Sequence, residues 1–113
     1  MTPKEYCQDK AAKSGSSFYY SFLFLPKAKR EAITALYAFC REVDDVVDEC
    51  KEASVAGIKL AWWRTEINGL YEGKPQHPVT KALAEVIHTC HLDQEHFIEI
   101  IDGMAMYLNL DHN

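Results

Sequence analysis

Apolar residues recur at helical spacing through most of the chain. The clearest series follows Pro26, ends near Cys50 and predicts one long helix. Its apolar positions are Ile33, Leu36, Cys40, Val43 and Val47. No stretch alternates between apolar and polar residues as a half-buried strand does. The pattern therefore predicts an all-α fold.

Further helices flank this one, and we expect about five helices in all. Capping residues, prolines and glycines mark the boundaries of the others. The expected start and end signals are Thr2 and Gly15, Ser54 and Gly73, Pro78 and Ile87, and Asp93 for the start of the last helix. Short connections favour antiparallel packing of neighbouring helices within one domain.

The residues between the first two predicted helices carry a large apolar load. Three phenylalanines and two tyrosines fall within Phe18 to Leu25. This run is too short to cross a bilayer, which takes about 20 apolar residues. It must therefore face a core, an apolar ligand or a membrane surface.

Composition narrows the class of protein. The 113 residues are 48% hydrophobic, enough for one apolar core. A net charge of -5 argues against nucleic acid as a partner. The four cysteines show no Cys-x-x-Cys pairing and no secretory signal precedes them, so we expect a reducing cytoplasm without disulfides.

Two aspartates on the long helix suggest a site. Asp44 and Asp48 lie only about 40° apart around the helix axis, so their carboxylates can share one ligand. Like charges at this spacing destabilise a helix by roughly 0.2–0.5 kcal/mol, which calls for a compensating cation. Magnesium suits such hard oxygen ligands and is usually held by one or two carboxylates and substrate phosphates.

Arg41 and Tyr37 extend the same stripe of the helix. The guanidinium of Arg41 could clamp a phosphate oxygen. An Asp-Asp-x-x-Asp run is also common as a solvated acidic face, and what favours a metal site is the apolar character of the rest of this helix.

Two other groups of residues could carry chemistry. His88, Cys90, His91 and His96 include ligands suited to zinc, but their spacing lacks a paired Cys-x-x-Cys and favours surface histidines. The pair Trp62 and Trp63 indicates packing in the core or between helices rather than ligand recognition.

Three blocks of sequence resemble the opening and the first aspartate-rich motif of squalene and phytoene synthases. The blocks are Ser16-Ser17-Phe18-Tyr19-Tyr20-Ser21-Phe22, Leu25-Pro26, and Tyr37-Ala-Phe-Cys-Arg41-x-x-Asp44-Asp45-x-x-Asp48. Weaker matches follow at Trp63-Arg64-Thr65-Glu66 and Gly103-Met104. In detail the chain looks most like the bacterial members of hopanoid biosynthesis that make presqualene diphosphate.

The resemblance implies the N-terminal helices of the isoprenoid synthase fold and a head-to-head condensation of two farnesyl diphosphates to presqualene diphosphate or squalene. Magnesium-assisted loss of diphosphate would leave an allylic cation, which the double bond of the second substrate attacks. Asp44 and Asp48 would be the magnesium ligands and Arg41 a diphosphate contact. Tyr37 would be a polar neighbour in the catalytic site, and Asp45 is a weaker candidate that points away.

The resemblance also assigns roles to the aromatic segment. Phe18 and Phe22 would line the pocket for the prenyl chain, where aromatic faces attract a cation. The alternative is that both rings are ordinary core residues. Ser17 could reach a phosphate oxygen, or it could simply cap a helix.

The chain departs from the family in two respects. Family members are longer, and their second aspartate-rich motif lies beyond the last residue here, so we expect residues 1–113 to be an N-terminal fragment of one synthase domain without activity alone. Tyr107 stands where relatives carry an aspartate, which puts any role of that position in doubt.

Two rival functions stay open. One is a phytoene-type synthase that uses geranylgeranyl diphosphate. The other is a non-catalytic helical module whose exposed apolar faces bind a partner, a second copy of the chain or, peripherally, a membrane. Whether a reductive step with NADPH follows is not decided by these residues.

Overall fold

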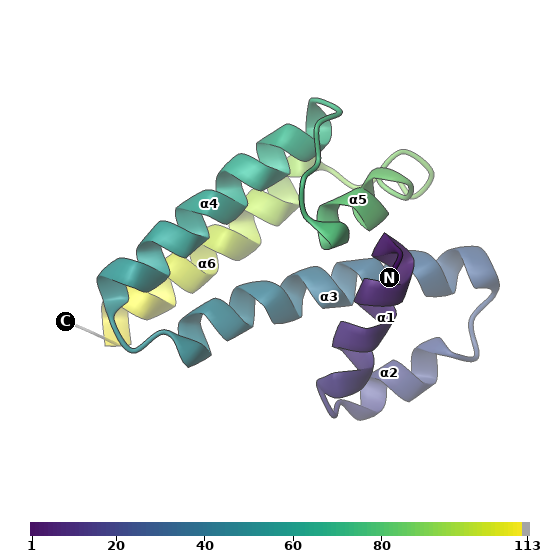
Figure 1. Cartoon of the computed structure of the whole chain (residues 1–113), viewed down its shortest axis with the longest axis horizontal. Coiled ribbons are helices and arrows are strands. Elements are labelled where there is room, and N and C mark those ends of the chain that lie inside the picture. Colours follow the sequence, from purple (N-terminus) through teal and green to yellow (C-terminus); the bar gives the residue numbers. More distant parts are fainter. Residues whose placement is uncertain (112–113) are drawn as a thin grey trace.

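The computed structural model describes residues 1–111, with side chains described up to Leu108. Within this range it contains six helices and no strand (Figure 1). They are α1 (Pro3–Lys13), α2 (Ser17–Phe22), α3 (Lys27–Glu49), α4 (Ala53–Tyr71), α5 (Pro78–Ala84) and α6 (Gln94–Asp111). The predicted all-α fold is confirmed, and the expected number of helices was one too few.

The additional helix is α2, which lies inside the aromatic segment. Gly15 ends α1 with a φ of 74°, a left-handed conformation that glycine adopts without strain. Ser16 then caps α2, because its hydroxyl accepts a hydrogen bond from the backbone N–H of Phe18 at 3.2 Å. From the sequence, this segment was treated as a connection. The six residues of α2, all aromatic or serine, are too few to show a helical period.

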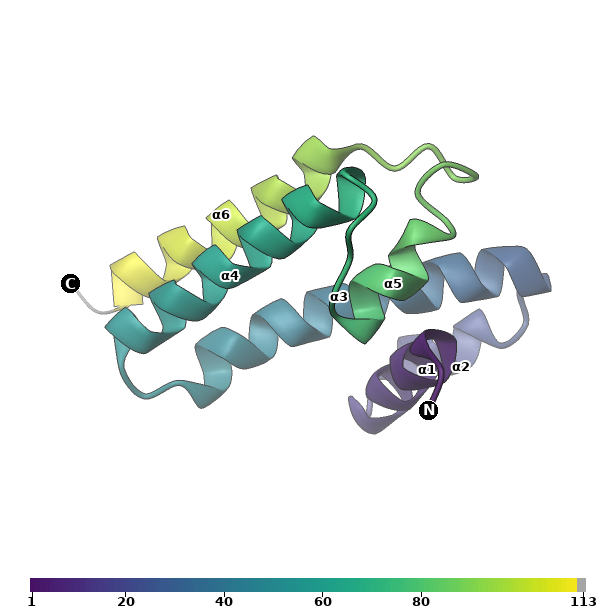
Figure 2. The same ribbon diagram turned by 45° about the horizontal axis from the view of Figure 1, so that its top comes forward.

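The long helix α3 organises the molecule. Pro26 is its N-cap and Cys50 its C-cap, as predicted from the apolar series. It packs against every other helix, with α1, α2 and α5 at one end and α4 and α6 along the other (Figure 2). Every functional candidate of the aspartate-rich motif therefore stands on the most extensively supported element.

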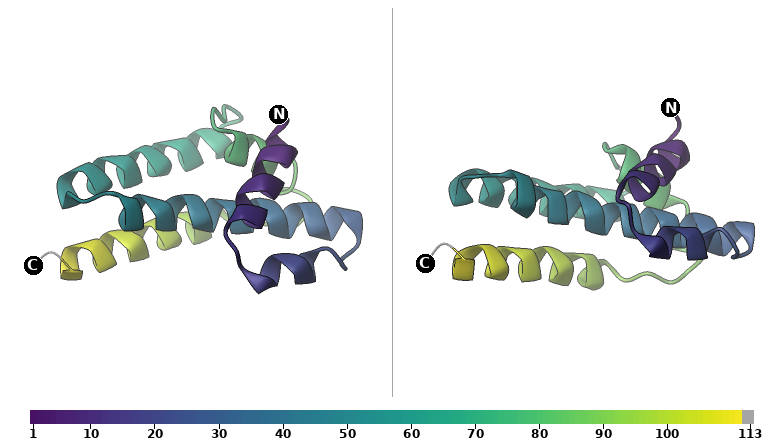
Figure 3. Two further views of the ribbon diagram at one scale, coloured as in Figure 1. Left: turned by 60° about the horizontal axis from the view of Figure 1, so that its bottom comes forward. Right: turned by 90° about the horizontal axis from the view of Figure 1, so that it is seen from below.

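The main core lies where α3, α4 and α6 meet. Figure 3 shows these three helices running side by side. Phe39 of α3 packs edge-on against Trp63 of α4 and Phe97 of α6, with ring centroids 5.8 Å and 5.2 Å apart. All three rings are at most 4% exposed. No helix among the described residues is long and apolar enough to cross a membrane.

Two predicted boundaries need correction. Ser54 does not cap α4, which begins at Ala53 after Glu52 and has no side-chain cap. The helix that starts at Pro78 ends at Ala84 rather than at Ile87. Residues 85–91 form turns, and the last of them, His91, has a φ of 54°. Asp93 directly precedes α6, as expected.

A buried carboxylate secures the loop between α4 and α5. Glu66 is 5% exposed and accepts hydrogen bonds from the backbone N–H groups of Gln76 at 2.8 Å and His77 at 2.7 Å. The hydroxyl of Thr80 donates a third hydrogen bond to the same oxygen. Burial favours the neutral acid, but these hydrogen bonds outweigh it and hold the pKa of Glu66 below its usual value.

Candidate functional site

Four side chains of α3 form the candidate site. Tyr37, Arg41, Asp44 and Asp48 follow one another at spacings of three or four residues, and we call this series the acidic stripe. Partial burial raises the pKa of Asp44, Arg41 lowers it, and the charges of Asp48 and Asp45 raise it again, so the net change is upward. The contribution of Asp48 agrees with the spacing of one helical turn between the two predicted ligands.

Asp45 has a different role from its neighbours. Its carboxylate contacts Lys10 of α1 at 2.5 Å and Arg41 at 2.9 Å, whereas Arg41 is 3.5 Å from Asp44. Asp45 therefore pairs with both nearby cations and links α1 to α3. Asp44 is left half-exposed with little compensation, and Asp48 is exposed.

The aromatic helix α2 packs on the first residue of the stripe. The rings of Phe22 and Tyr37 lie 5.6 Å apart and nearly perpendicular, and the hydroxyl of Tyr37 is 3.2 Å from that of Ser14. Phe22 is half-buried there, whereas Phe18 is 69% exposed. The alternative that both rings are core residues is thus wrong for Phe18. We call Phe18 and Phe22 of α2 the aromatic wall, which adjoins the acidic stripe at Tyr37.

Ser17 occupies the first position of α2 and is exposed. The alternative that Ser17 is a helix cap is wrong, because Ser16 supplies the capping oxygen. The predicted contact of Ser17 with a phosphate oxygen stays a prediction.

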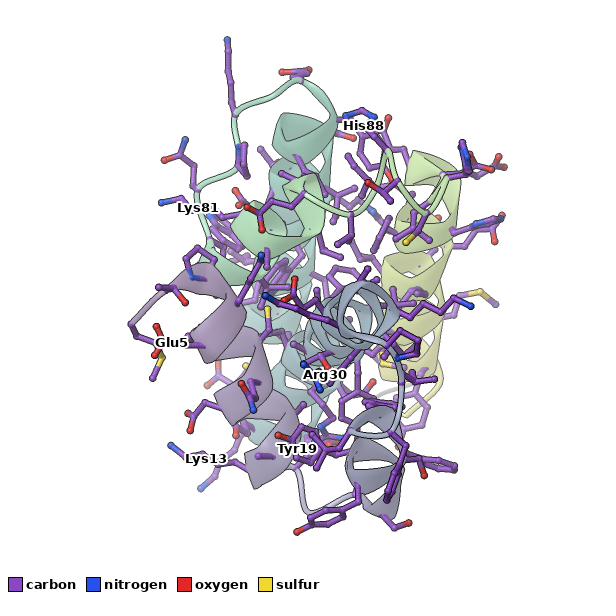
Figure 4. All side chains as sticks on the ribbon, turned by 90° about the vertical axis from the view of Figure 1, so that its right-hand side faces the viewer. Glu5, Lys13, Tyr19, Arg30, Lys81 and His88 are labelled. Atoms are coloured by element: carbon purple, nitrogen blue, oxygen red, sulfur yellow. The ribbon has the colours of Figure 1, made fainter. Side chains whose placement is uncertain are left out.

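The described residues do not enclose the stripe in a hollow. A cleft of about 330 Å³ lies between α1, α3 and α5, and Glu5, Tyr19 and Arg30 on its border are labelled in Figure 4. A second cleft of about 290 Å³ lies beside Lys10, Trp62 and His77. Neither includes Asp44, Asp48 or Phe18 in its lining, and both Asp48 and Phe18 are exposed.

Comparison with known proteins decides the family. The family model described as "Squalene/phytoene synthase" matches residues 11–112. The chain belongs to the squalene/phytoene synthase family. The resemblance seen in the motifs is therefore confirmed, and the matched region contains both the aromatic segment and the acidic stripe. No solved structure matches this family member.

Individual relatives agree. The presqualene diphosphate synthase of Zymomonas mobilis is 50% identical over 99 residues, covering 86% of this chain and 33% of the relative. That of Rhodopseudomonas palustris is 40% identical over 97 residues, covering 86% and 34%. The 15-cis-phytoene synthase of Synechocystis is 35% identical over 104 residues, covering 92% and 31%. The chain thus spans about a third of the length of these relatives.

The described residues of this family member form no complete metal site, and magnesium at Asp44 and Asp48 stays a prediction. No group of three histidine, cysteine or acidic side chains in residues 1–108 is arranged to hold a metal, and the four candidate zinc ligands are exposed. Those candidates are His88, Cys90, His91 and His96. Two neighbouring carboxylates, Asp44 and Asp48, match magnesium, which completes its shell with water and phosphate oxygens.

Two residues near the second cleft were misjudged or missed. Trp63 is a core residue as expected, but Trp62 is 47% exposed beside His77. Lys10 was not singled out, although it compensates Asp45. The two are 35 positions apart, so no local spacing could have identified the pair.

Proposed function

We propose that the acidic stripe binds the diphosphate of a prenyl substrate for head-to-head condensation, in which two farnesyl diphosphates form presqualene diphosphate. The observation that carries this proposal is the poorly compensated pair Asp44 and Asp48 on a stripe that continues, through Tyr37, into an exposed aromatic wall. One end suits a metal-bound diphosphate and the other an apolar chain. Few ligands other than a prenyl diphosphate need both.

Each residue then has a defined task. Asp44 and Asp48 would hold magnesium, which when bound supplies the positive charge that stabilises a departing diphosphate. Arg41 would contact a phosphate oxygen while Asp45 keeps its guanidinium in place. Phe18 and Phe22 would face the hydrocarbon, where their rings stabilise positive charge by roughly 0.5–2 kcal/mol per contact. Tyr37 and Ser17 would donate hydrogen bonds at the boundary between the two regions.

The choice of farnesyl over geranylgeranyl diphosphate is supported by identity. The presqualene diphosphate synthase of Zymomonas mobilis is 50% identical to this chain, compared with 35% for the phytoene synthase of Synechocystis. The phytoene-type reaction is the second candidate, because phytoene synthases also match most of the chain.

A thermal unfolding experiment tests the diphosphate site. Because the chain spans about a third of its relatives, the experiment measures binding rather than turnover. Magnesium with farnesyl thiodiphosphate, a poorly reactive analogue, should raise the Tm by several degrees, because ligand at about 100 times its Kd adds roughly 2.7 kcal/mol. Asp44→Asn and Asp48→Asn should each abolish the shift.

Glu99→Gln serves as a control, since it removes an exposed carboxylate from α6 and should leave the shift intact. A shift that survives both aspartate substitutions would refute the assignment. Absence of any shift in the unsubstituted chain would favour the non-catalytic module. A larger shift with the geranylgeranyl analogue would favour the phytoene-type reaction.

A further inference from the structure

The segment that joins α2 to α3 exposes a concentration of large apolar side chains. Phe24 is 89% exposed, the highest value for any of them. Among the described residues, eleven large apolar side chains are exposed, and five of these fall within residues 18–25. Soluble proteins rarely gather exposed apolar groups so densely unless the surface binds something.

Charge is segregated onto the same part of the chain. Residues 10–30 contain five of the twelve basic residues and none of the seventeen acidic ones. Lys27, Lys29 and Arg30 form no ion pair with the described residues, whereas Lys10 and Lys13 each have an acidic partner. The rest of the chain is strongly acidic, so residues 10–30 are a locally cationic stretch of an anionic protein.

The apolar and basic groups adjoin at one end of the molecule. We call residues 23–29 the α2–α3 tip; it begins where α2 ends and includes the first turn of α3. Figures 1 and 3 show that it lies away from the C-terminal end of α6. Phe24, Lys27 and Lys29 are all exposed there.

We propose that the α2–α3 tip docks on an anionic lipid surface. Phe24 and its leucine neighbours would enter the interfacial region, and Lys27 and Lys29 would contact lipid phosphates. The acidic body of the protein is repelled by the same surface, so the tip is the part that approaches it. Docking would place the aromatic wall of α2 beside the lipid.

Lipid is favoured over a protein partner by the combination of features. Aromatic and aliphatic side chains next to unpaired lysines match the two layers of a membrane interface, apolar below and anionic above. A second copy of this chain would present the same positive charge, and the two tips would repel each other. Phe18 lies outside the tip, in α2, and is assigned to the proposed diphosphate site.

Vesicle co-sedimentation of the 113-residue chain tests the proposal. The chain should bind phosphatidylcholine vesicles that contain phosphatidylglycerol, and binding should weaken with added salt. Replacing both lysines, Lys27→Gln with Lys29→Gln, should weaken binding by roughly fivefold per lysine. Phe24→Ser should weaken it by about tenfold.

Ile58→Ser is the matched control, because Ile58 is 70% exposed on α4, outside the basic region. It should bind as the unsubstituted chain does. Helical circular dichroism checks that each variant is folded. The thermal shift with magnesium and the farnesyl analogue should be unchanged by Phe24→Ser, so this test is independent of the proposed diphosphate site.

Three outcomes would overturn the proposal. The first is absence of binding to anionic vesicles at low salt. The second is an equal loss of binding in Ile58→Ser. The third is a chain that self-associates in solution and becomes monomeric with Phe24→Ser without ever binding vesicles, which would identify the tip as a protein interface.

Discussion

Glu66 and Asp44 stand on neighbouring helices and use the same chemical group in opposite ways. Glu66 is buried and accepts three hydrogen bonds, which hold its pKa below the usual value. Asp44 is half-exposed, its nearest cation is mainly engaged with Asp45, and its pKa is raised. The acceptor sites of the Glu66 carboxylate are already filled by the protein's own donors. Those of Asp44 can still accept a cation or a hydrogen bond.

The contrast offers a way to separate structural from functional acids in this molecule. A carboxylate whose lone pairs are filled by the protein's own donors has no capacity left for a metal ion. One that is crowded by like charge gains from any cation that arrives. Glu66 and Asp44 should therefore respond to substitution with opposite signs.

The largest effect is expected at Glu66. Glu66→Ala should lower the free energy of unfolding by about 3 kcal/mol, because it leaves buried donors of the loop and of Thr80 without an acceptor. Urea unfolding measures the loss. Glu72→Ala, at an exposed acid after the end of α4, should change stability by less than about 0.5 kcal/mol. Equal effects of the two substitutions would remove the distinction drawn above.

A smaller effect, dependent on pH, is expected at His77. Its Nδ1 accepts a hydrogen bond from the N–H of Val79 at 3.0 Å and so caps α5. Burial lowers the pKa of His77, the charges of Glu42 and Glu66 raise it, and Lys10 lowers it again, with a net decrease. The native state thus binds fewer protons than the unfolded chain, and stability falls as pH drops below about 6.5.

The loss should amount to about 1 kcal/mol, the usual contribution of a helix cap. His77→Asn keeps a capping oxygen but does not titrate, so it should flatten the dependence of the unfolding free energy on pH between roughly 7 and 5. Glu66 stays ionised in this interval because its pKa is lowered below 4.5. A slope that persists in His77→Asn would assign the titration to another group.

The smallest effect, and the one of opposite sign, is expected at Asp44. Asp44→Asn should raise stability by roughly 0.2–0.5 kcal/mol at neutral pH, since it removes repulsion from Asp48. Because the folded pKa of Asp44 is raised, the penalty is present above that pKa and disappears as pH falls through it. The advantage of the variant should therefore shrink in acid.

Asp45→Asn is the neighbouring control for this substitution. It breaks contacts with Lys10 and Arg41 and should lower stability instead. Urea unfolding of both variants at two pH values compares them. Destabilisation by Asp44→Asn would show that this carboxylate, like Glu66, serves the fold.

The features that could be predicted from the sequence are those that depend on residues close together in the chain. The 3.6-residue period located α3 between Pro26 and Cys50 and placed Asp44 beside Asp48, because both depend only on neighbouring residues. The helix α2 escaped notice, since its six residues are too few to show a period. Its existence depends on a cap and on packing against α3.

Contacts between distant residues account for the rest. Helical geometry indicated that Asp45 points away from Asp44, but not that α1 brings Lys10 to meet it. The packing of Phe22 on Tyr37 likewise depends on the turn at Gly15. Glu66 left a usable signal, a single acid among the apolar positions of α4. Its three donors come from the following loop and from Thr80 of α5, which sequence alone does not place.

The contacts of α3 with all five other helices have a consequence for how the molecule moves. If α4 and α6 loosened, α3 would lose its packing contacts at one end. If α1, α2 and α5 loosened, it would lose those at the other end. If the proposed diphosphate ligand binds Asp44 and Asp48, it should slow the opening of α3, and backbone amides in both groups should become harder to exchange with solvent. Binding at the proposed site would then rigidify all six described helices.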